Sequence, residues 1–134
     1  MELIETLLSA QVLVCLFLAI LFLQSGLDKV LDWSGNLGWL NSHFEKTFPK
    51  ASIPLLLGTI TVVEIAAGVM AALGAVLLLL DGSTEFALWG LRLSALSIVM
   101  LFFGQRLAKD YDGAATLAIY FGLILVGFLV FNAA

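Results

Sequence analysis

Residues 53–80 read IPLLLGTITVVEIAAGVMAALGAVLLLL, and the only charged side chain in this stretch is Glu64. A helix needs about 20 consecutive apolar residues to cross the hydrocarbon core of a bilayer. Strands of a membrane barrel are shorter, about 10 residues, and alternate in polarity. The stretch therefore predicts a transmembrane helix that carries one ionisable group into the membrane.

Three further apolar runs have the length of a membrane span: 7–27, 86–104 and 113–131. Of these, only 86–104 contains a charge, Arg92. The chain of 134 residues is 62% hydrophobic and 12% charged, whereas a typical soluble domain is about 45–50% apolar and about 25% charged. We therefore predict an all-α protein, with a single transmembrane domain over 1–134 that forms a four-helix bundle in the lipid bilayer.

The connection between the first two spans has its own periodic pattern. Apolar side chains recur there at helical spacing, with polar residues between them: Trp33, Leu37, Leu40, Phe44 and Phe48. One apolar stripe with a polar opposite face is typical of an amphipathic helix. We expect a short helix over about 36–48 that lies in the membrane interface or covers one end of the bundle.

The basic residues of the loops predict the orientation. With four spans, both termini and the turn at 81–85 share a side that carries no Lys or Arg. The other side carries Lys29, Lys46, Lys50, Arg106 and Lys109. The positive-inside rule places that side in the cytoplasm and both termini outside. A net charge of −4 without a basic patch argues against nucleic-acid binding.

Cysteine and histidine are too few for most resident cofactors. The chain has one cysteine, Cys15, and one histidine, His43. Zinc, haem and iron–sulfur sites normally take several Cys or His ligands. The sequence therefore predicts no metal and no intrinsic cofactor, and it leaves a diffusible quinone or a cofactor on a partner subunit. With no catalytic triad or phosphate-binding loop, we expect no catalysis by this chain alone.

Two ionisable residues lie within predicted spans, where each is costly. At 1.5 Å per residue, Glu64 lies about 15 Å from the start of its span and Arg92 about 18 Å from the end of its own, so their depths nearly agree. Arg92 could pair with Glu64, or its side chain could extend to the interface to meet Glu85 or Asp81. Tyr120 could reach Glu64 from the fourth span. Without a cationic partner Glu64 is expected to be protonated, either as a structural donor to Tyr120 or as a proton-exchanging, quinone-binding group.

Small residues on the predicted spans indicate helix packing, because they let a neighbouring helix approach closely. One set lies at the end of the first span and on the Glu64 face of the second, and another recurs every four residues in the fourth. The predicted packing residues are Gly26, Gly68, Ala71, Ala75, Ala114, Ala118 and Gly122.

Charged residues gather at the cytoplasmic ends of the spans. Asp28 and Lys29 follow the first span, and Arg106, Lys109 and Asp110 lie between the third and the fourth. We expect these two groups to contact a partner subunit or to form a polar lid. Ordinary anchoring in lipid headgroups is the alternative.

Two stretches resemble the DoxX family of small four-span bacterial membrane proteins. Residues 22–33 read FLQSGLDKVLDW, and residues 62–79 read VVEIAAGVMAALGAVLLL. Gly26 and Lys29 in the first stretch, and Glu64 and Gly68 in the second, match the family pattern. The resemblance extends over nearly the whole chain and implies a protein of the bacterial cytoplasmic (inner) membrane. Some members of that family accompany respiratory or sulfur-oxidising quinone oxidoreductases, so the resemblance implies a similar setting for this chain.

Three functions are compatible with these features. The first is a DoxX-like accessory or structural subunit of a larger bacterial membrane complex, redox, respiratory or secretion-related. The second is a quinone-interacting oxidoreductase membrane subunit in which Glu64 exchanges protons, with Arg92 or Tyr120 beside it. The third is a small transporter or channel, for which one Glu, one Arg and one Tyr make a thin polar path.

Overall fold

The computed structural model describes residues 3–132, and within them all regular structure is helical, as the sequence predicts. The helices are α1 (Leu3–Leu7), α2 (Ala10–Leu31), α3 (Trp33–His43), the 3-10 helix η1 (Lys50–Ser52), α4 (Ile53–Leu80), α5 (Glu85–Leu107) and α6 (Tyr111–Asn132). Four long stretches, built on α2, α4, α5 and α6, have the length and hydropathy to cross a membrane. The chain is therefore a multi-pass membrane protein with an all-α bundle.

The first span differs most from its predicted bounds. The sequence indicates 7–27, but α2 begins at Ala10, after Ser9, whose hydroxyl accepts a hydrogen bond from the Val12 amide at 3.3 Å. It then continues to Leu31. The helix thus extends four residues beyond the predicted apolar run. Its last turn carries Lys29, which would end a span in lipid but here finds a partner inside the protein.

The helix in the first connection lies earlier than the predicted 36–48. It begins at Trp33 because the Asp32 carboxylate caps it and accepts from the Gly35 amide at 3.3 Å. It ends at His43, with Phe44 as C-cap. A proline disfavours α-helical geometry in the residue before it, so Pro49 stops the helix from extending through residue 48.

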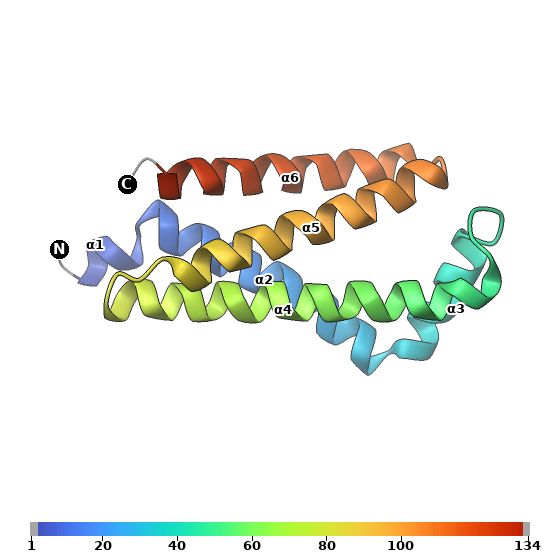
Figure 1. Ribbon diagram of the computed structural model, residues 1–134, viewed down its shortest axis with the longest axis horizontal. Helices are drawn as coiled ribbons and strands as arrows, with labels where there is room; N and C mark the ends of the chain where they lie inside the picture. Colours follow the sequence, from blue (N-terminus) through green and yellow to red (C-terminus); the bar gives the residue numbers. More distant parts are fainter. Residues whose placement is uncertain (1–2, 133–134) are drawn as a thin grey trace.

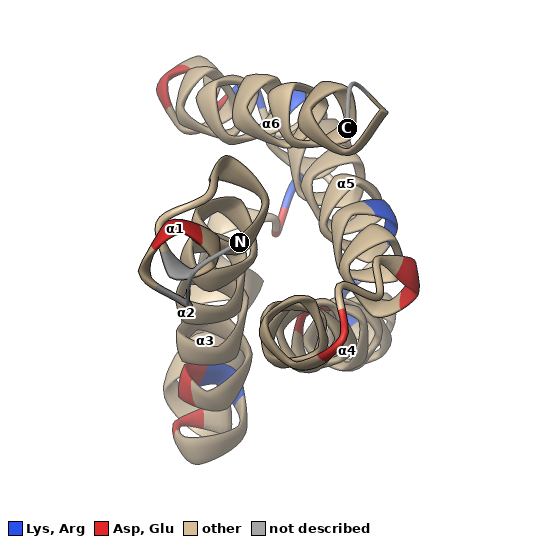
Figure 2. Cartoon of the chain, turned by 90° about the vertical axis from the view of Figure 1, so that its left-hand side faces the viewer, with Lys and Arg blue, Asp and Glu red and all other residues tan. Residues whose placement is uncertain are grey.

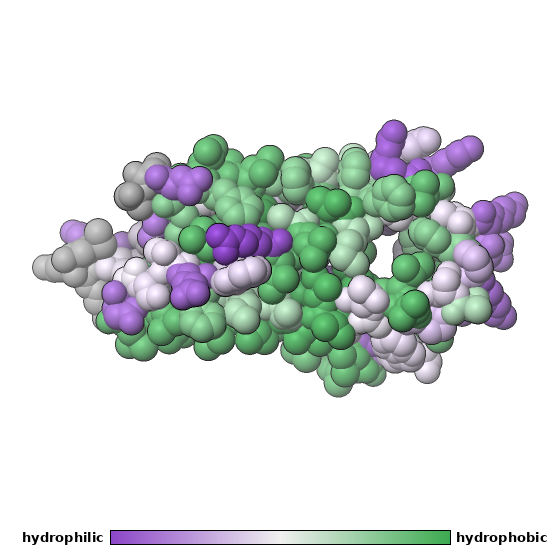
Figure 3. All heavy atoms as spheres, in the orientation of Figure 1, coloured by the Kyte–Doolittle hydropathy of each residue, from purple (hydrophilic) through white to green (hydrophobic). Residues whose placement is uncertain are grey.

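The long helix α4 is the centre of the arrangement (Figure 1). It packs along α2 on one side and along α5 on the other, and α6 packs mainly on α5. Figure 2 shows the same order from the end where both chain termini lie. We call this the terminal end, and we call the opposite end, with α3, η1 and the α5–α6 turn, the loop end. Apolar residues cover the middle of the molecule, and hydrophilic ones gather toward the two ends (Figure 3).

Small residues bring α4 and α5 into backbone contact. A Cβ added at Gly74 would lie 2.5 Å from the Ala87 Cα, and one added at Gly90 would lie 2.8 Å from the Ala71 amide nitrogen. Such distances leave no room for a side chain at either glycine. The two contacts also fix the antiparallel register of what we call the α4–α5 seam.

Small residues also bring α2 and α4 into close contact. A Cβ at Gly68 would lie 2.8 Å from the Leu23 amide nitrogen, and one at Gly26 would lie 2.5 Å from the Ile65 Cγ1 atom. Of the predicted packing residues, five are buried within the chain: Gly26, Gly68, Ala71, Ala75 and Ala114.

Within the described residues, only the first member of the predicted packing stripe on α6, Ala114, packs against another helix of the chain. Ala118 and Gly122 are exposed, and a Cβ added at Gly122 would meet no atom within 4 Å. The buried side of α6 instead carries Ile124 and Gly127. A four-residue repeat indicates a smooth helix face, but it does not say which face of the helix meets the rest of the same chain.

Candidate functional site

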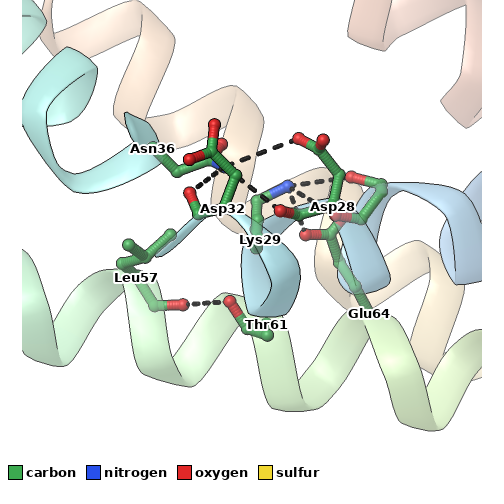
Figure 4. Close-up of polar contacts among 8 residues, drawn as sticks. Asp28, Lys29, Asp32, Asn36, Leu57, Thr61 and Glu64 are labelled. Carbon is green, nitrogen blue, oxygen red and sulfur yellow. Dashed lines mark hydrogen bonds and ion pairs between the residues drawn. The ribbon is translucent and has the colours of Figure 1, made fainter. Parts of the chain in front are cut away.

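An ion pair joins the last turn of α2 to the middle of α4 (Figure 4). The Lys29 ammonium lies 2.9 Å from Glu64 Oε1. It also donates to the Ser25 hydroxyl at 2.8 Å and to the Ser25 carbonyl at 3.4 Å. Glu64 is 1% exposed, while the Lys29 side chain is 17% exposed. The Glu64 carboxylate therefore lies inside the bundle, and the Lys29 side chain that pairs with it lies nearer to the surface.

Local sequence explains why these groups meet. Ser25 and Lys29 are one helical turn apart, so they share a face of α2. Gly26, between them, lets α2 approach α4 at Ile65. Glu64 enters this contact from the buried face of α4. Removing either charge from such a pair leaves the other buried without compensation, which is why intramembrane ionisable groups usually have partners.

A polar layer continues from Glu64 onto α5. The register set by the glycine contacts runs on toward the loop end, and at helical spacing it places Ser94 opposite Ala67 and Ser97 opposite Glu64. Both serines are 0% exposed. Their hydroxyls have no hydrogen-bond partner among the described residues. Buried hydroxyls normally find one, so the two serines have spare hydrogen-bonding capacity, and neither of them bonds to the Glu64 carboxylate.

Arg92 is not the partner of Glu64. Its side chain lies on the exposed side of α5, with the guanidinium carbon 4.9 Å from the centre of the Trp89 ring. Within residues 3–132, no ion pair joins it to Glu85 or Asp81 either. A cation over an aromatic face is stabilised by the ring's electrons. The charge of Arg92 is therefore stabilised by Trp89, on the same helix.

Tyr120 does not reach the carboxylate. It is half-buried and packs against the apolar core cluster that includes Leu18, Phe22 and Ile124. No hydrogen bond joins Tyr120 to Glu64 in the part of the chain that the structure describes. The expected carboxyl–phenol contact is therefore wrong. Because Glu64 has Lys29 as a cationic partner, the premise of the Tyr120 alternative, a carboxyl group without a cation beside it, does not hold.

A second polar cluster closes the loop end. His43 Nε2 lies 3.0 Å from Gln105 Oε1 and 3.4 Å from Asp110 Oδ2. Asp110 Oδ1 accepts from the Gly113 amide at 3.0 Å and so caps the start of α6. The Trp39 ring stacks on His43, with 4.4 Å between ring centres. This cluster ties α3 to the α5–α6 turn. Of its residues, the sequence predicts only Asp110 as part of a partner contact or polar lid. His43 stands within the predicted helix 36–48, and no pattern there points to Gln105 or Asp110 as its neighbours.

Two of the other charged residues predicted at this end, Asp28 and Arg106, have local partners. The Asn36 amide donates to Asp28 Oδ2 at 3.5 Å, and the Arg106 guanidinium lies 4.6 Å from the Tyr111 ring centre. Lys109 is exposed and has a φ of 62° in the turn. Asp28 and Lys109 thus stay available at the surface, whereas Lys29 points into the bundle.

Two cavities lie between α3 and the neighbouring helices at the loop end, where Figure 3 shows a hollow. The first, of about 170 Å³, is almost wholly apolar. The second, of about 440 Å³, has a mixed surface to which Asn41, Ser42, Glu45 and Lys50 contribute, and Ile53 lines both cavities. The apolar cavity is bounded by Trp39, Leu40, Phe44, Phe48, Ile53, Leu56, Leu57, Ile60, Met100, Leu101, Gly104 and Gln105.

Among residues 3–132, no group of three or more His, Cys, Asp or Glu side chains is placed to hold a metal ion. No protein-family model, curated protein or solved structure matches the chain. The candidate sites are the Lys29–Glu64 pair with its polar layer, the cavities at the loop end and a groove between α5 and α6.

Proposed function

We propose that the protein is an accessory, non-catalytic subunit of a larger complex in the bacterial cytoplasmic membrane, redox, respiratory or secretion-related. The observation that carries this proposal is an open groove on the outer side of the bundle, between α5 and α6. The groove has a volume of about 170 Å³ and is lined by Ile98, Val99, Phe102, Ala118 and Phe121.

Small exposed residues continue this outer face along α6. Gly122 lies one helical turn from Ala118, and no atom of residues 3–132 lies within 4 Å of a Cβ added there. In lipid, where apolar surface alone gives helices little reason to associate, small residues are what allow another helix to approach closely. A partner helix would find here the contact that Ala118 and Gly122 do not make within the chain. The resemblance to DoxX proteins supports the same setting.

The test is co-purification from native membranes in a mild detergent. The unmodified chain should bring larger membrane subunits with it. Ala118→Leu should fill the groove and release them while the chain still accumulates in the membrane. Val62→Phe, which enlarges an exposed side chain on α4, is the matched control and should retain the partners. Recovery of the unmodified chain only as a monomer or homo-oligomer would contradict the proposal.

A second candidate, a quinone-interacting membrane subunit, is favoured by the position of Glu64. The next layer of the α4–α5 seam toward the loop end is Ile60 and Leu101, and both line the apolar cavity. A quinol ring in that cavity would lie about one helical turn from the Glu64 layer. On oxidation, the quinol would release its protons toward Glu64, and its two electrons would pass to a redox cofactor on a partner subunit.

Glu64→Gln separates the two candidates, because it removes the proton acceptor and keeps the shape. In the assembled complex, quinol turnover should fall while the subunit composition is unchanged. Ser97→Ala, which alters the same layer without touching the charge, is the control for a general disturbance of packing. Unchanged turnover in an assembled Glu64→Gln complex would exclude a proton-exchanging role.

A further inference from the structure

Of the charged side chains that the structure describes, only Arg92 is exposed more than one turn from the ends of a membrane-spanning helix. It lies about 10 Å from the start of α5 at Glu85. Its guanidinium contacts the Trp89 ring, and within residues 3–132 it has no ion pair or hydrogen bond. An aromatic face attracts the charge but supplies no oxygen acceptor for the N–H donors. The guanidinium therefore remains able to bind an anion.

Arg92 lies along the continuation of the α5–α6 groove. Val99 lines this groove from α5 and lies seven residues after Arg92. On the other wall, Ala118 lines the groove from α6 and lies seven residues before Leu125. Seven residues make about two turns, so each pair shares a face of its helix. Arg92 and Leu125 therefore continue the two walls toward the terminal end.

The register of the two helices places these residues at nearly the same level. A Cβ added at Gly127 would lie 2.7 Å from Leu91 Cδ2. Because α5 and α6 run antiparallel (Figure 1), a step back along α6 matches a step forward along α5. Leu125, which is exposed, thus lies close to the level of Arg92. A helix that fills the groove and follows it toward the terminal end passes Arg92 on its α5 side.

A lipid phosphate is a poor match for Arg92 because of Glu85. This acid is exposed and lies seven residues before Arg92, on the same face of α5 at its terminal end. A phosphate that approaches from the headgroup region meets the Glu85 carboxylate first, and Asp81 in the preceding turn adds a second negative charge. A carboxylate on a neighbouring helix can instead reach the depth of Arg92 about 10 Å away from Glu85.

A second copy of the chain does not supply this carboxylate. Two copies with the same topology place equal residues at equal depths in the membrane. The acidic residues among 3–132 lie in connections or near helix ends, with the exception of Glu64. Glu64 is buried and paired with Lys29. The anion that fits Arg92 therefore belongs to a different protein.

We propose that the helix in the α5–α6 groove belongs to a different membrane subunit and carries one Asp or Glu side chain that forms an ion pair with Arg92. The inference rests on the proposed function as an accessory subunit and specifies the chemistry of its partner. A carboxylate can accept bidentate N–H bonds from a guanidinium, and each charge compensates the other inside the membrane. The apolar groove accepts many helices, whereas the guanidinium selects those that carry an acid.

Co-purification from native membranes measures the contribution of Arg92. Arg92→Gln should lower the amount of retained partner by about tenfold or more, because it leaves the partner's carboxylate without a cation. Arg92→Lys keeps the charge and should retain more partner than Arg92→Gln. Lys46→Gln, which removes an exposed positive charge outside the groove, is the matched control. Equal retention by Arg92→Gln and the unmodified chain would overturn the inference.

Arg92 is exposed, so its variants should accumulate in the membrane as the unmodified chain does, which immunoblotting of the membrane fraction checks. If Ala118→Leu releases the partner and Arg92→Gln does not, the groove holds the partner without the ion pair. This inference then fails, and the proposed function as an accessory subunit stands.

Photo-crosslinking identifies the partner segment. A benzoylphenylalanine in place of Leu125 should form a cross-link to a membrane-spanning segment that contains an Asp or a Glu, which mass spectrometry of the cross-linked peptide reads. Replacing that acid by its amide should release the unmodified chain and add little to the loss caused by Arg92→Gln. A cross-linked segment without an acid would overturn this inference alone. Cross-links only to lipid or to a second copy, with no co-purified subunit, would overturn the proposed function as well.

Discussion

The two halves of α4 meet their neighbours in opposite ways. Toward the terminal end, Gly68 and Gly74 touch the backbones of α2 and α5 directly. Toward the loop end, Leu57 and Ile60 form the walls of a cavity. The helix carries small residues where two neighbours must both come close, and large ones where the neighbours diverge. The comparison shows that α4, although apolar along its whole length, packs closely against its neighbours only in its terminal half.

Glu64 lies at the border between the two halves. On its terminal side the α4–α5 seam is closed, and on its loop side lies the apolar cavity. The long Lys29 side chain reaches the carboxylate from the last turn of α2, where α2 gives way to α3. The Lys29–Glu64 pair therefore lies at the level of α4 where close contact between helices gives way to the apolar cavity. Three variants test this division.

The largest effect is expected for Lys29→Met. It leaves the Glu64 carboxylate buried without a cation, and breaking a buried pair in this way typically costs about 3–5 kcal/mol. Unfolding of the chain in detergent, followed by circular dichroism, measures the loss. The double variant Lys29→Met with Glu64→Gln should recover most of the stability. A single variant as stable as the parent would show that the pair does not stabilise the border.

A smaller effect is expected for Gly74→Ala. The new methyl group would overlap the Ala87 backbone, and overpacking of this kind costs about 1–3 kcal/mol. Gly58→Ala is the matched variant in the loop half, where the nearest atom, of Trp33, is 3.8 Å from the new Cβ. It should be neutral or stabilising by up to about 1 kcal/mol through helix propensity. Equal losses in the two variants, in the same unfolding measurement, would contradict the comparison.

The smallest effect is expected for His43→Ala. The variant removes the tie between α3 and the α5–α6 turn, and a partly exposed hydrogen bond contributes about 1 kcal/mol. Hydrogen exchange should rise in residues 33–48 and stay unchanged in the α4–α5 seam. Lys46→Gln, on the same connection, is the control. Faster exchange throughout the bundle would mean that the loop end supports the closed half as well.

The fold was largely predictable, because the length of each apolar run in the sequence shows whether it can cross a membrane. The second span was predicted at its exact bounds, 53–80. The first was not, because its apolar run ends at Asp28 and Lys29 although the helix continues to Leu31. A helix can carry such residues when the protein compensates them, and the sequence of one span does not reveal its partner.

The partner of Glu64 was mispredicted for a related reason. Counting residues along the two spans predicts nearly equal depths for Glu64 and Arg92, but the α4–α5 register puts Ser97 opposite Glu64, and Arg92 lies five residues, about 7.5 Å, further toward the terminal end. Depth also does not give the direction around the helix. Arg92 is five residues from Ser97, which is about 140° around α5 at 100° per residue, so it faces away from α4. The signal that could have helped is the spacing of Ala87, Gly90, Ser94 and Ser97, which mirrors the small residues of α4.

The Lys29–Glu64 contact has a consequence for biosynthesis. A chain emerges from the ribosome N-terminus first, so α2 is integrated before α4 is complete. When the acid of the second span arrives at the translocation machinery, its counter-ion is already anchored nearby. Reversing the order of the two charges in the chain would preserve the finished contact, but it would make a lone carboxylate at the end of α2 wait for its ammonium during insertion.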